Sequence, residues 1–232
     1  MPIAPRTWWN LGLGAILLLV LGFALRERRL QERDGLPAPP RPAVDAGAIP
    51  LGAPSLDLLQ IISVSQEVVN GDWAKDAEGL KTGDAPYSRL ALVPPPGEYD
   101  LQLEVERRQG EDSLDLGLVA DGRQFLVVID GWTKGELSGI DLIHEKPFFG
   151  NLTTYGGRLL ALNRPTELVA SVRKSGVTLK VDGRVVFQWP ADYAGVRLYP
   201  EWKIPDPSKL FIGSYATRFL IRRLVLVDRT QG

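Results

Sequence analysis

Short apolar runs separated by turn signals extend from Leu56 to Val227, and this pattern restricts the possible folds more than any other sequence feature. Apolar and polar residues alternate strictly over Tyr99–Glu106, which is the period of a half-buried strand. Asp121-Gly122 and Asp182-Gly183 are typical hairpin turns. Leu56–Val69 is compatible with a short helix or a strand. Further strands are expected at residues 87–93, 114–118, 124–129, 168–172, 177–181, 185–189, 210–213 and 219–227.

About a dozen short strands in about 175 residues predict an all-β domain. No long stretch of this region carries the 3.6-residue period of an amphipathic helix, and no unit repeats along it. The pattern indicates an antiparallel two-sheet sandwich or a barrel and does not distinguish between them.

Composition removes several classes of function. The chain has no cysteine and one histidine, His144, which excludes disulfides, thiolate catalysis, thiolate zinc sites and paired histidines. Lys and Arg total 27 against 28 Asp and Glu, a net charge of −1, which argues against a nucleic-acid partner. No Asp-x-Asp-x-Asp run supports a calcium loop, so neither a metal nor a cofactor is expected.

The N-terminal region has the features of a membrane anchor. After a tail at residues 1–7, residues 8–25 carry no charge, and as a helix they would span about 27 Å, close to the hydrocarbon thickness of a bilayer. Trp8 and Trp9 lie where an interfacial anchor belongs. Small residues at Gly22-Phe23-Ala24 leave a cleaved signal peptide as the alternative. We expect a single-pass protein of the cell membrane.

Two arguments about orientation conflict. Four arginines follow the span within residues 26–33, and the positive-inside rule places such a flank in the cytoplasm. The fold expected for the domain is more common outside the cytoplasm, and we expect it there. Between the span and the domain, residues 26–54 form an Arg-rich flank and a Pro-rich linker. This composition predicts a semi-rigid spacer before a domain at residues 55–232.

Several short motifs resemble those of a known family. Gly71-Asp72-Trp73 followed by Glu78-Gly79-Leu80 resembles the opening of concanavalin A-like (laminin-G-like) jelly-roll domains. Glu98–Leu101, Val181-Asp182-Gly183 and Ile212-Gly213-Ser214 resemble their later strands.

The resemblance covers roughly residues 56–227 and is strongest to bacterial modules near the 3-keto-disaccharide hydrolase group. It implies a jelly-roll sandwich. Because the motifs are strand and turn motifs, they specify the fold better than the function.

The sharpest candidate site opens the long loop expected at residues 133–158. Asp130 and Trp132 end an apolar strand, and Asp141, His144 and Asn151 follow in the loop. An exposed tryptophan beside carboxylates and amides can stack on a sugar ring and bind its hydroxyls. The structural alternative is that Trp132 caps the core and Asp130 makes a turn. His144 alone is more typical of a surface residue than of a ligand.

A second candidate wall is the proline-stiffened loop that carries Glu201 and Trp202, which would otherwise pack over one end of the sandwich. Glu104 and Glu106 alternate with apolar residues on one strand and are expected to face solvent.

The catalytic motif of jelly-roll glucanases, Glu-x-Asp-x-x-Glu, is absent, so no catalytic residue is assigned. We therefore expect a membrane-anchored binding or interaction module, with a saccharide or an envelope protein as its partner. The alternative is a sugar-active hydrolase or lyase of the 3-keto-disaccharide hydrolase type. An open cleft with two convergent carboxyls would favour the enzyme, and an aromatic platform without them would favour the binding module. A third interpretation is a structural domain in an envelope assembly.

Overall fold

The computed structural model describes residues 54–132 and 135–230. The predicted tail, the membrane span at residues 8–25 and the flank and linker up to residue 53 lie outside the described residues. Within the part of the chain that is described, no helix is both long and apolar enough to cross a bilayer.

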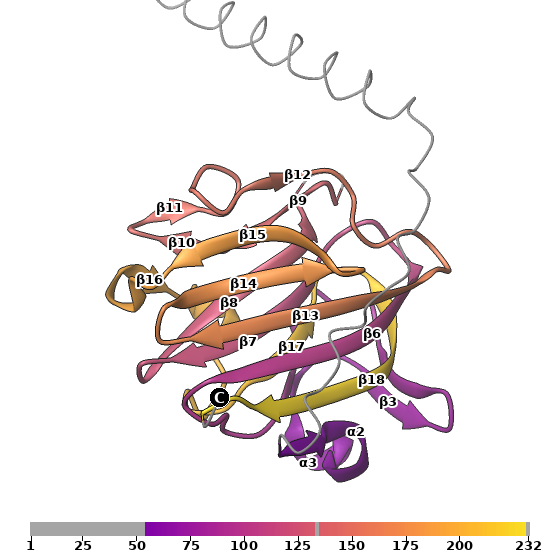
Figure 1. Ribbon diagram of the computed structural model, residues 1–232. Helices are drawn as coiled ribbons and strands as arrows, with labels where there is room; N and C mark the ends of the chain where they lie inside the picture. Colours follow the sequence, from indigo (N-terminus) through magenta and orange to yellow (C-terminus); the bar gives the residue numbers. More distant parts are fainter. Residues whose placement is uncertain (1–53, 133–134, 231–232) are drawn as a thin grey trace, which may run out of the picture. The chain divides into compact units, whose positions relative to one another are not determined.

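Two antiparallel sheets stack face to face (Figure 1), which confirms an all-β sandwich. In the described residues, sheet A runs in the order β15 (Arg184–Pro190), β14 (Gly176–Val181), β13 (Pro165–Arg173), β6 (Tyr99–Gln109), β18 (Arg218–Asp228), β4 (Gly79–Thr82) and β3 (Trp73–Asp76), with β1 (Ser55–Asp57) on β18. Sheet B runs in the order β12 (Tyr155–Gly156), β9 (Leu137–Ile140), β8 (Arg123–Gly131), β7 (Leu114–Ala120), β17 (Phe211–Ser214), β5 (Ser88–Ala91) and β2 (Val68–Asn70).

Two segments differ from the sequence prediction. The predicted loop at residues 133–158 contains β9 and β12, which lie at the margin of sheet B. It also contains β10 (Leu142–Ile143) and β11 (Lys146–Pro147), which form a small third sheet with β16 (Val196–Arg197). The ambiguous start of the domain forms both structures. After β1 come two single-turn helices, α2 (Leu58–Ile61) and α3 (Val64–Glu67), and then β2.

The predicted strands and turns otherwise agree with the structure. Along β6, alternate residues from Tyr99 to Val105 are fully buried between the sheets. The hairpin turn between β7 and β8 has positive φ at Asp121 (49°) and Gly122 (68°), and that between β14 and β15 has it at Asp182 (46°) and Gly183 (76°). Left-handed backbone at both central residues matches the right-handed twist of the strands that the turn joins.

The outer face of β6 is less exposed than predicted. Glu106 points away from the core but is only 4% exposed. Its carboxylate accepts hydrogen bonds from Arg108 (2.8 Å) and Arg222 (3.0 Å). The prediction that Glu106 faces solvent is therefore wrong, because arginine side chains from the same sheet cover it; Glu104 is half-buried.

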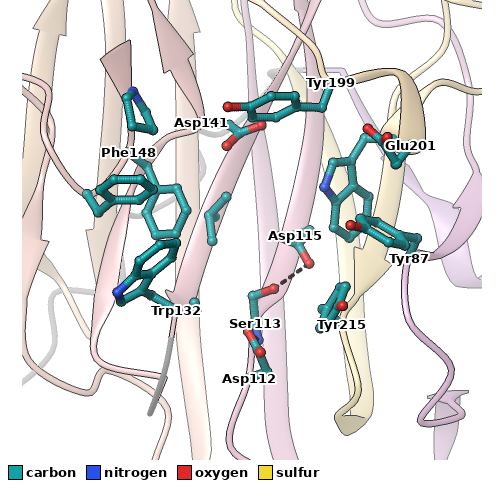
Figure 2. A pocket seen from close by; sticks show the side chains of 15 residues that line it. Tyr87, Asp112, Ser113, Asp115, Trp132, Asp141, Phe148, Tyr199, Glu201 and Tyr215 are labelled. Carbon is teal, nitrogen blue, oxygen red and sulfur yellow. Dashed lines mark hydrogen bonds between the residues drawn. The ribbon is translucent and has the colours of Figure 1, made fainter.

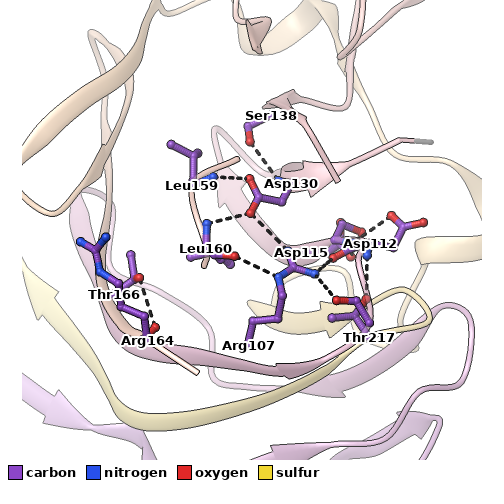
Figure 3. A network of polar contacts seen from close by, with 12 residues as sticks. Arg107, Asp112, Asp115, Asp130, Ser138, Leu159, Leu160, Arg164, Thr166 and Thr217 are labelled. Atoms are coloured by element: carbon purple, nitrogen blue, oxygen red, sulfur yellow. Dashed lines mark hydrogen bonds and ion pairs between the residues drawn. The ribbon is translucent and has the colours of Figure 1, made fainter. Parts of the chain in front are cut away.

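A buried ion pair joins the two sheets at one end of the sandwich (Figure 3). Arg107 of β6 lies 3.2 Å from Asp130 of β8, and both side chains are completely buried. The Asp130 carboxylate also accepts the backbone N–H groups of Leu159 and Leu160, each at 2.7 Å. Arg107 donates in addition to the backbone oxygens of Leu160 (3.1 Å) and Asp112 (2.7 Å). The pair thus fixes the ends of both strands and the segment before β13.

Replacing Arg107 with methionine should destabilise the protein strongly. The substitution keeps most of the side-chain volume but leaves the Asp130 carboxylate buried without its cation, which typically costs about 3–5 kcal/mol. For a domain of this size, that corresponds to a melting temperature roughly 10 °C lower. The control is Arg164→Ala, which breaks an exposed pair with Asp182 (2.8 Å) and should cost at most about 1 kcal/mol. Equal melting temperatures for the two variants would show that the buried pair has no special structural role.

Candidate functional site

A pocket of about 510 Å³ lies on the outer face of sheet B, where β7 and β8 meet the loops at one end of the sandwich. Two walls of aromatic side chains face each other across a polar floor (Figure 2). Trp132 and Phe148 lie on one side, Tyr87 and Tyr215 lie on the other, and Asp115 lies between them.

The first wall is built around Trp132, directly after β8. Its side chain is 48% exposed and packs on Phe149, with ring centroids 4.2 Å apart. Phe148 supports Phe149 edge to face at 5.6 Å. The backbone of Trp132 has a φ of 72° and that of Asp130 a φ of 56°. Such conformations are strained for residues with a large side chain and concentrate at functional sites.

The second wall comes from distant segments of the chain. Trp202 is buried, stacks on Phe211 at 6.4 Å and contacts Tyr87 edge to face at 5.4 Å. Tyr87 in turn contacts Tyr215 at 4.9 Å. A Cβ atom at Gly213 of β17 would lie 2.8 Å from the Trp202 indole. A glycine is therefore needed at this position for the indole to lie directly over the sheet.

The floor contains two buried carboxyl groups without full hydrogen bonding. Ser113 donates its hydroxyl to Oδ2 of Asp115 at 2.8 Å. Among the described residues, Oδ1 of Asp115 and Oδ2 of Asp141 have no hydrogen-bond partner. Asp115 is fully buried and Asp141 is 4% exposed, yet both line the pocket. Unpaired buried polar atoms are rare in folded proteins and call for a specific explanation, such as a catalytic role or a bound water or ion.

Burial changes the proton affinity of both groups. It raises the pKa of Asp141 to about 7. It also raises the pKa of Asp115 well above the ordinary range, an effect that the Ser113 hydrogen bond opposes and that Asp112 and Asp141 reinforce. Carboxyls with raised pKa values in a pocket can hold or release a proton near neutral pH.

The structure brings four of the seven residues expected from the sequence into this pocket: Trp132, Asp141, Glu201 and Trp202. Trp132 is exposed, as a stacking residue must be, and Glu201 is exposed at the rim. Asp130 is outside the pocket, and its carboxylate is engaged by Arg107 and two backbone N–H groups. Asp130 therefore has the structural role, because its burial keeps it from contacting a ligand in the pocket.

The other two expected residues also lie elsewhere. His144 is on the surface, 2.6 Å from the Asp192 carboxylate. Asn151 shapes its own loop by donating to the backbone oxygen of Ile140 at 2.8 Å and accepting from the backbone N–H of Thr153 at 2.9 Å.

Sequence reasoning missed most of the remaining lining residues, including Asp115 itself. In the sequence, Asp115 is the polar member of the alternating run Leu114–Leu118, which indicates a solvent-facing position. The available signal was Gly117 on the same face of the strand. A glycine inside a strand often marks a place where another group packs closely over it, and here the Phe211 ring does so. The other missed residues are Tyr87, Asp112, Ser113, Val128, Gly131, Pro147, Phe148, Phe149, Tyr199 and Tyr215.

No group of three or more His, Asp or Glu side chains placed to hold a metal ion occurs in residues 54–132 and 135–230.

Comparison with known proteins gives a fold rather than a family. No family model and no curated protein matches the sequence. Among solved structures, the carbohydrate-binding module CBM66 from Bacillus subtilis is similar with a TM-score of 0.51 and 11% identity, over 69% of this chain and 94% of that chain.

The exoplasmic/lumenal domain of VIP36 in its Ca²⁺/Man3GlcNAc-bound form has a TM-score of 0.50 and 10% identity, over 77% of this chain and 89% of that chain. The apo Crh5 transglycosylase has a TM-score of 0.50 and 12% identity, over 77% and 85%. These similarities show that the described domain has the concanavalin-like jelly-roll sandwich fold.

Proposed function

We propose that the domain is a saccharide-binding module and that the pocket on sheet B is its binding site. The observation that carries this proposal is the pair of facing aromatic walls, one of them the exposed Trp132 on Phe149, above a floor of buried carboxyls. Sugar rings have apolar faces that stack on aromatic rings, and their hydroxyls donate hydrogen bonds to carboxyl oxygens.

The size of the pocket supports the proposal. A volume of about 510 Å³ lies within the usual range for small-molecule sites, roughly 300–1,000 Å³. Two proteins that share the fold are named for, or were crystallised with, carbohydrate: the CBM66 module and the VIP36 domain. The low identities mean that this support concerns the scaffold, and the site is argued from its own residues.

Trp132→Ala should weaken saccharide binding and leave the fold intact. Loss of a stacked ring removes on the order of 1–3 kcal/mol, or roughly 10- to 100-fold in Kd. Because Trp132 is half exposed, its truncation should hardly change the melting temperature. The measurement is a glycan array with the purified full chain, followed by calorimetric titration of the saccharides that bind.

Leu152→Ala is the matched control, because Leu152 is 91% exposed and does not line the pocket. A parent protein that binds no saccharide, together with a Trp132→Ala variant that melts much earlier, would contradict the proposal. Release of new reducing ends in the same incubations would instead support the alternative of a hydrolase near the 3-keto-disaccharide group. The convergent carboxyls of Asp115 and Asp141 favour that alternative.

Asp141→Asn should stabilise the protein in a pH-dependent way. Folding raises the pKa of Asp141 from 3.8 to about 7, so between these values the folded state holds a proton that the unfolded chain has lost. The stabilisation from this group is present below about pH 4 and is lost as the pH rises to about 7. Asparagine does not ionise, so the variant should melt several degrees above the parent near pH 8 and close to it near pH 4.

Asp121→Asn, on the exposed turn between β7 and β8, is the control and should show no such trend. Asp115, Tyr199 and Glu201 face the same pocket, and Arg89 lies on the same sheet face, so the comparison is made between variants rather than with an absolute curve. A melting difference that stays constant from acid to alkaline pH would show that Asp141 does not hold a raised pKa.

We also propose that residues 8–25 anchor the domain in a membrane as a single span, with residues 26–54 as a spacer. The uncharged run and its tryptophans support this. The protein should remain in the membrane fraction after an alkaline carbonate wash. A soluble mature form that begins near Leu25 would instead establish a cleaved signal peptide.

A further inference from the structure

The charged residues that line the pocket are all acidic. The carboxyl groups of Asp112, Asp115, Asp141 and Glu201 line it, and the described lining residues include no arginine, lysine or histidine. Arg89 lies on the same face of sheet B, across Gly213 of β17 from Asp115, and its buried Nε has no hydrogen-bond partner among the described residues. The site therefore offers carboxyl oxygens to whatever binds there, and a bound cation would favour the negatively charged form of these groups.

The two deepest carboxyls lack the partners that would compensate them. Asp115 receives one hydrogen bond, from Ser113, and its Oδ1 is unpartnered; Oδ2 of Asp141 is unpartnered as well. A buried carboxylate without a cation is costly, and the cost is removed when a bound group supplies both hydrogen-bond donors and positive charge. A neutral hydroxyl supplies only the donor, and an anionic group adds to the repulsion.

The cation that suits this site is organic. Divalent metal sites commonly gather several carboxylate or imidazole side chains, and the described residues contain no group of three His, Asp or Glu side chains placed for this. The aromatic walls favour an ammonium ion instead, because the faces of Trp132 and the neighbouring rings attract cations. An ammonium group also carries three donors, which matches the unpartnered oxygens of the floor.

We propose that the pocket selects saccharides that carry a free, protonated amine. This inference rests on the proposed saccharide-binding function and names its ligand class. The amine pairs with the floor carboxyls of Asp115 and Asp141, while the sugar ring lies between the aromatic walls. Uronic acid and sulfated saccharides are disfavoured, because their negative charge would face four carboxyl groups.

The test compares two probes that differ only at the amine. Short β-1,4-linked glucosamine oligomers and their N-acetylated counterparts of equal length are titrated calorimetrically into the detergent-purified full chain near pH 7. The glucosamine oligomers should bind at least about 10-fold more tightly, since one compensated charge is worth on the order of a tenfold change in Kd. Oligolysine of the same charge should bind more weakly, because it has no sugar ring to lie between the aromatic walls.

Asp115→Asn and Asp141→Asn should each reduce the preference for the free amine several-fold, with the preference measured as the ratio of the Kd values of the acetylated and the free-amine oligomer for the same variant. Both substitutions preserve shape, and a melting curve for each confirms folding. Asp121→Asn, which removes an exposed carboxylate far from the pocket, should leave the preference unchanged and so excludes a general effect of net charge.

The outcomes separate this inference from the function on which it rests. Equal or tighter binding of the acetylated oligomer, or a preference that survives both Asp→Asn substitutions, overturns the amine selectivity while saccharide binding stands. Binding only of other neutral saccharides, through Trp132, overturns it in the same way. If no saccharide of either kind binds, the proposed function and this inference both fail.

Discussion

The buried ion pair between Arg107 and Asp130 is the interaction on which the site depends. It connects the central strand of sheet A to the end of β8 in sheet B and holds the segment at Leu159 and Leu160 through backbone hydrogen bonds. Asp130 adopts a left-handed backbone that would be unfavourable without these contacts. Because the chain is fixed there, Trp132, two residues later, projects from the strand end onto Phe149 rather than into the core. An aspartate outside the pocket thus determines where Trp132 lies.

The two faces of sheet B differ in what they bury. The inner face packs against sheet A through apolar side chains and stabilises the fold. The outer face is also largely buried, by an apolar cluster that includes Trp202 and Phe211, and two uncompensated carboxyls line the pocket on this face. Such groups reduce stability at neutral pH, and nothing in the fold requires them. Proteins tolerate local strain and unpaired groups mainly where they bind or react. The two carboxyls at the bottom of the pocket therefore support the proposal that this surface is a binding site.

The strands and turns could be predicted because local rules govern them, while the choice of a sandwich over a barrel rested on the family resemblance. Alternation along β6 and the Asp-Gly turns are fixed by neighbouring residues, and the structure confirms both. The site depends on contacts between distant segments. Asp130 and Asp141 look equivalent in the sequence, but Arg107 engages the first and leaves the second in the pocket. Asp115 looked solvent-facing because the indole that covers its strand comes from residue 202. Periodicity reports which face of a strand a residue occupies, but not what covers that face.

Each part of the pocket comes from a different stretch of the chain. Asp115 lies on β7, and the aromatic residues lie next to other strands: Tyr87 before β5, Trp132 after β8, Phe148 after β11, Trp202 before β17 and Tyr215 after β17. No local hairpin contains enough of these residues to bind a ligand by itself. The pocket exists only when the strands of sheet B and the loops beside them have come together, so under the proposed function a bound ligand would stabilise this whole assembly and no single hairpin. Ligand affinity and cooperative folding would then be linked. A substitution far from the pocket that loosens the sandwich lowers the apparent affinity by reducing the fraction of molecules in which the walls face each other.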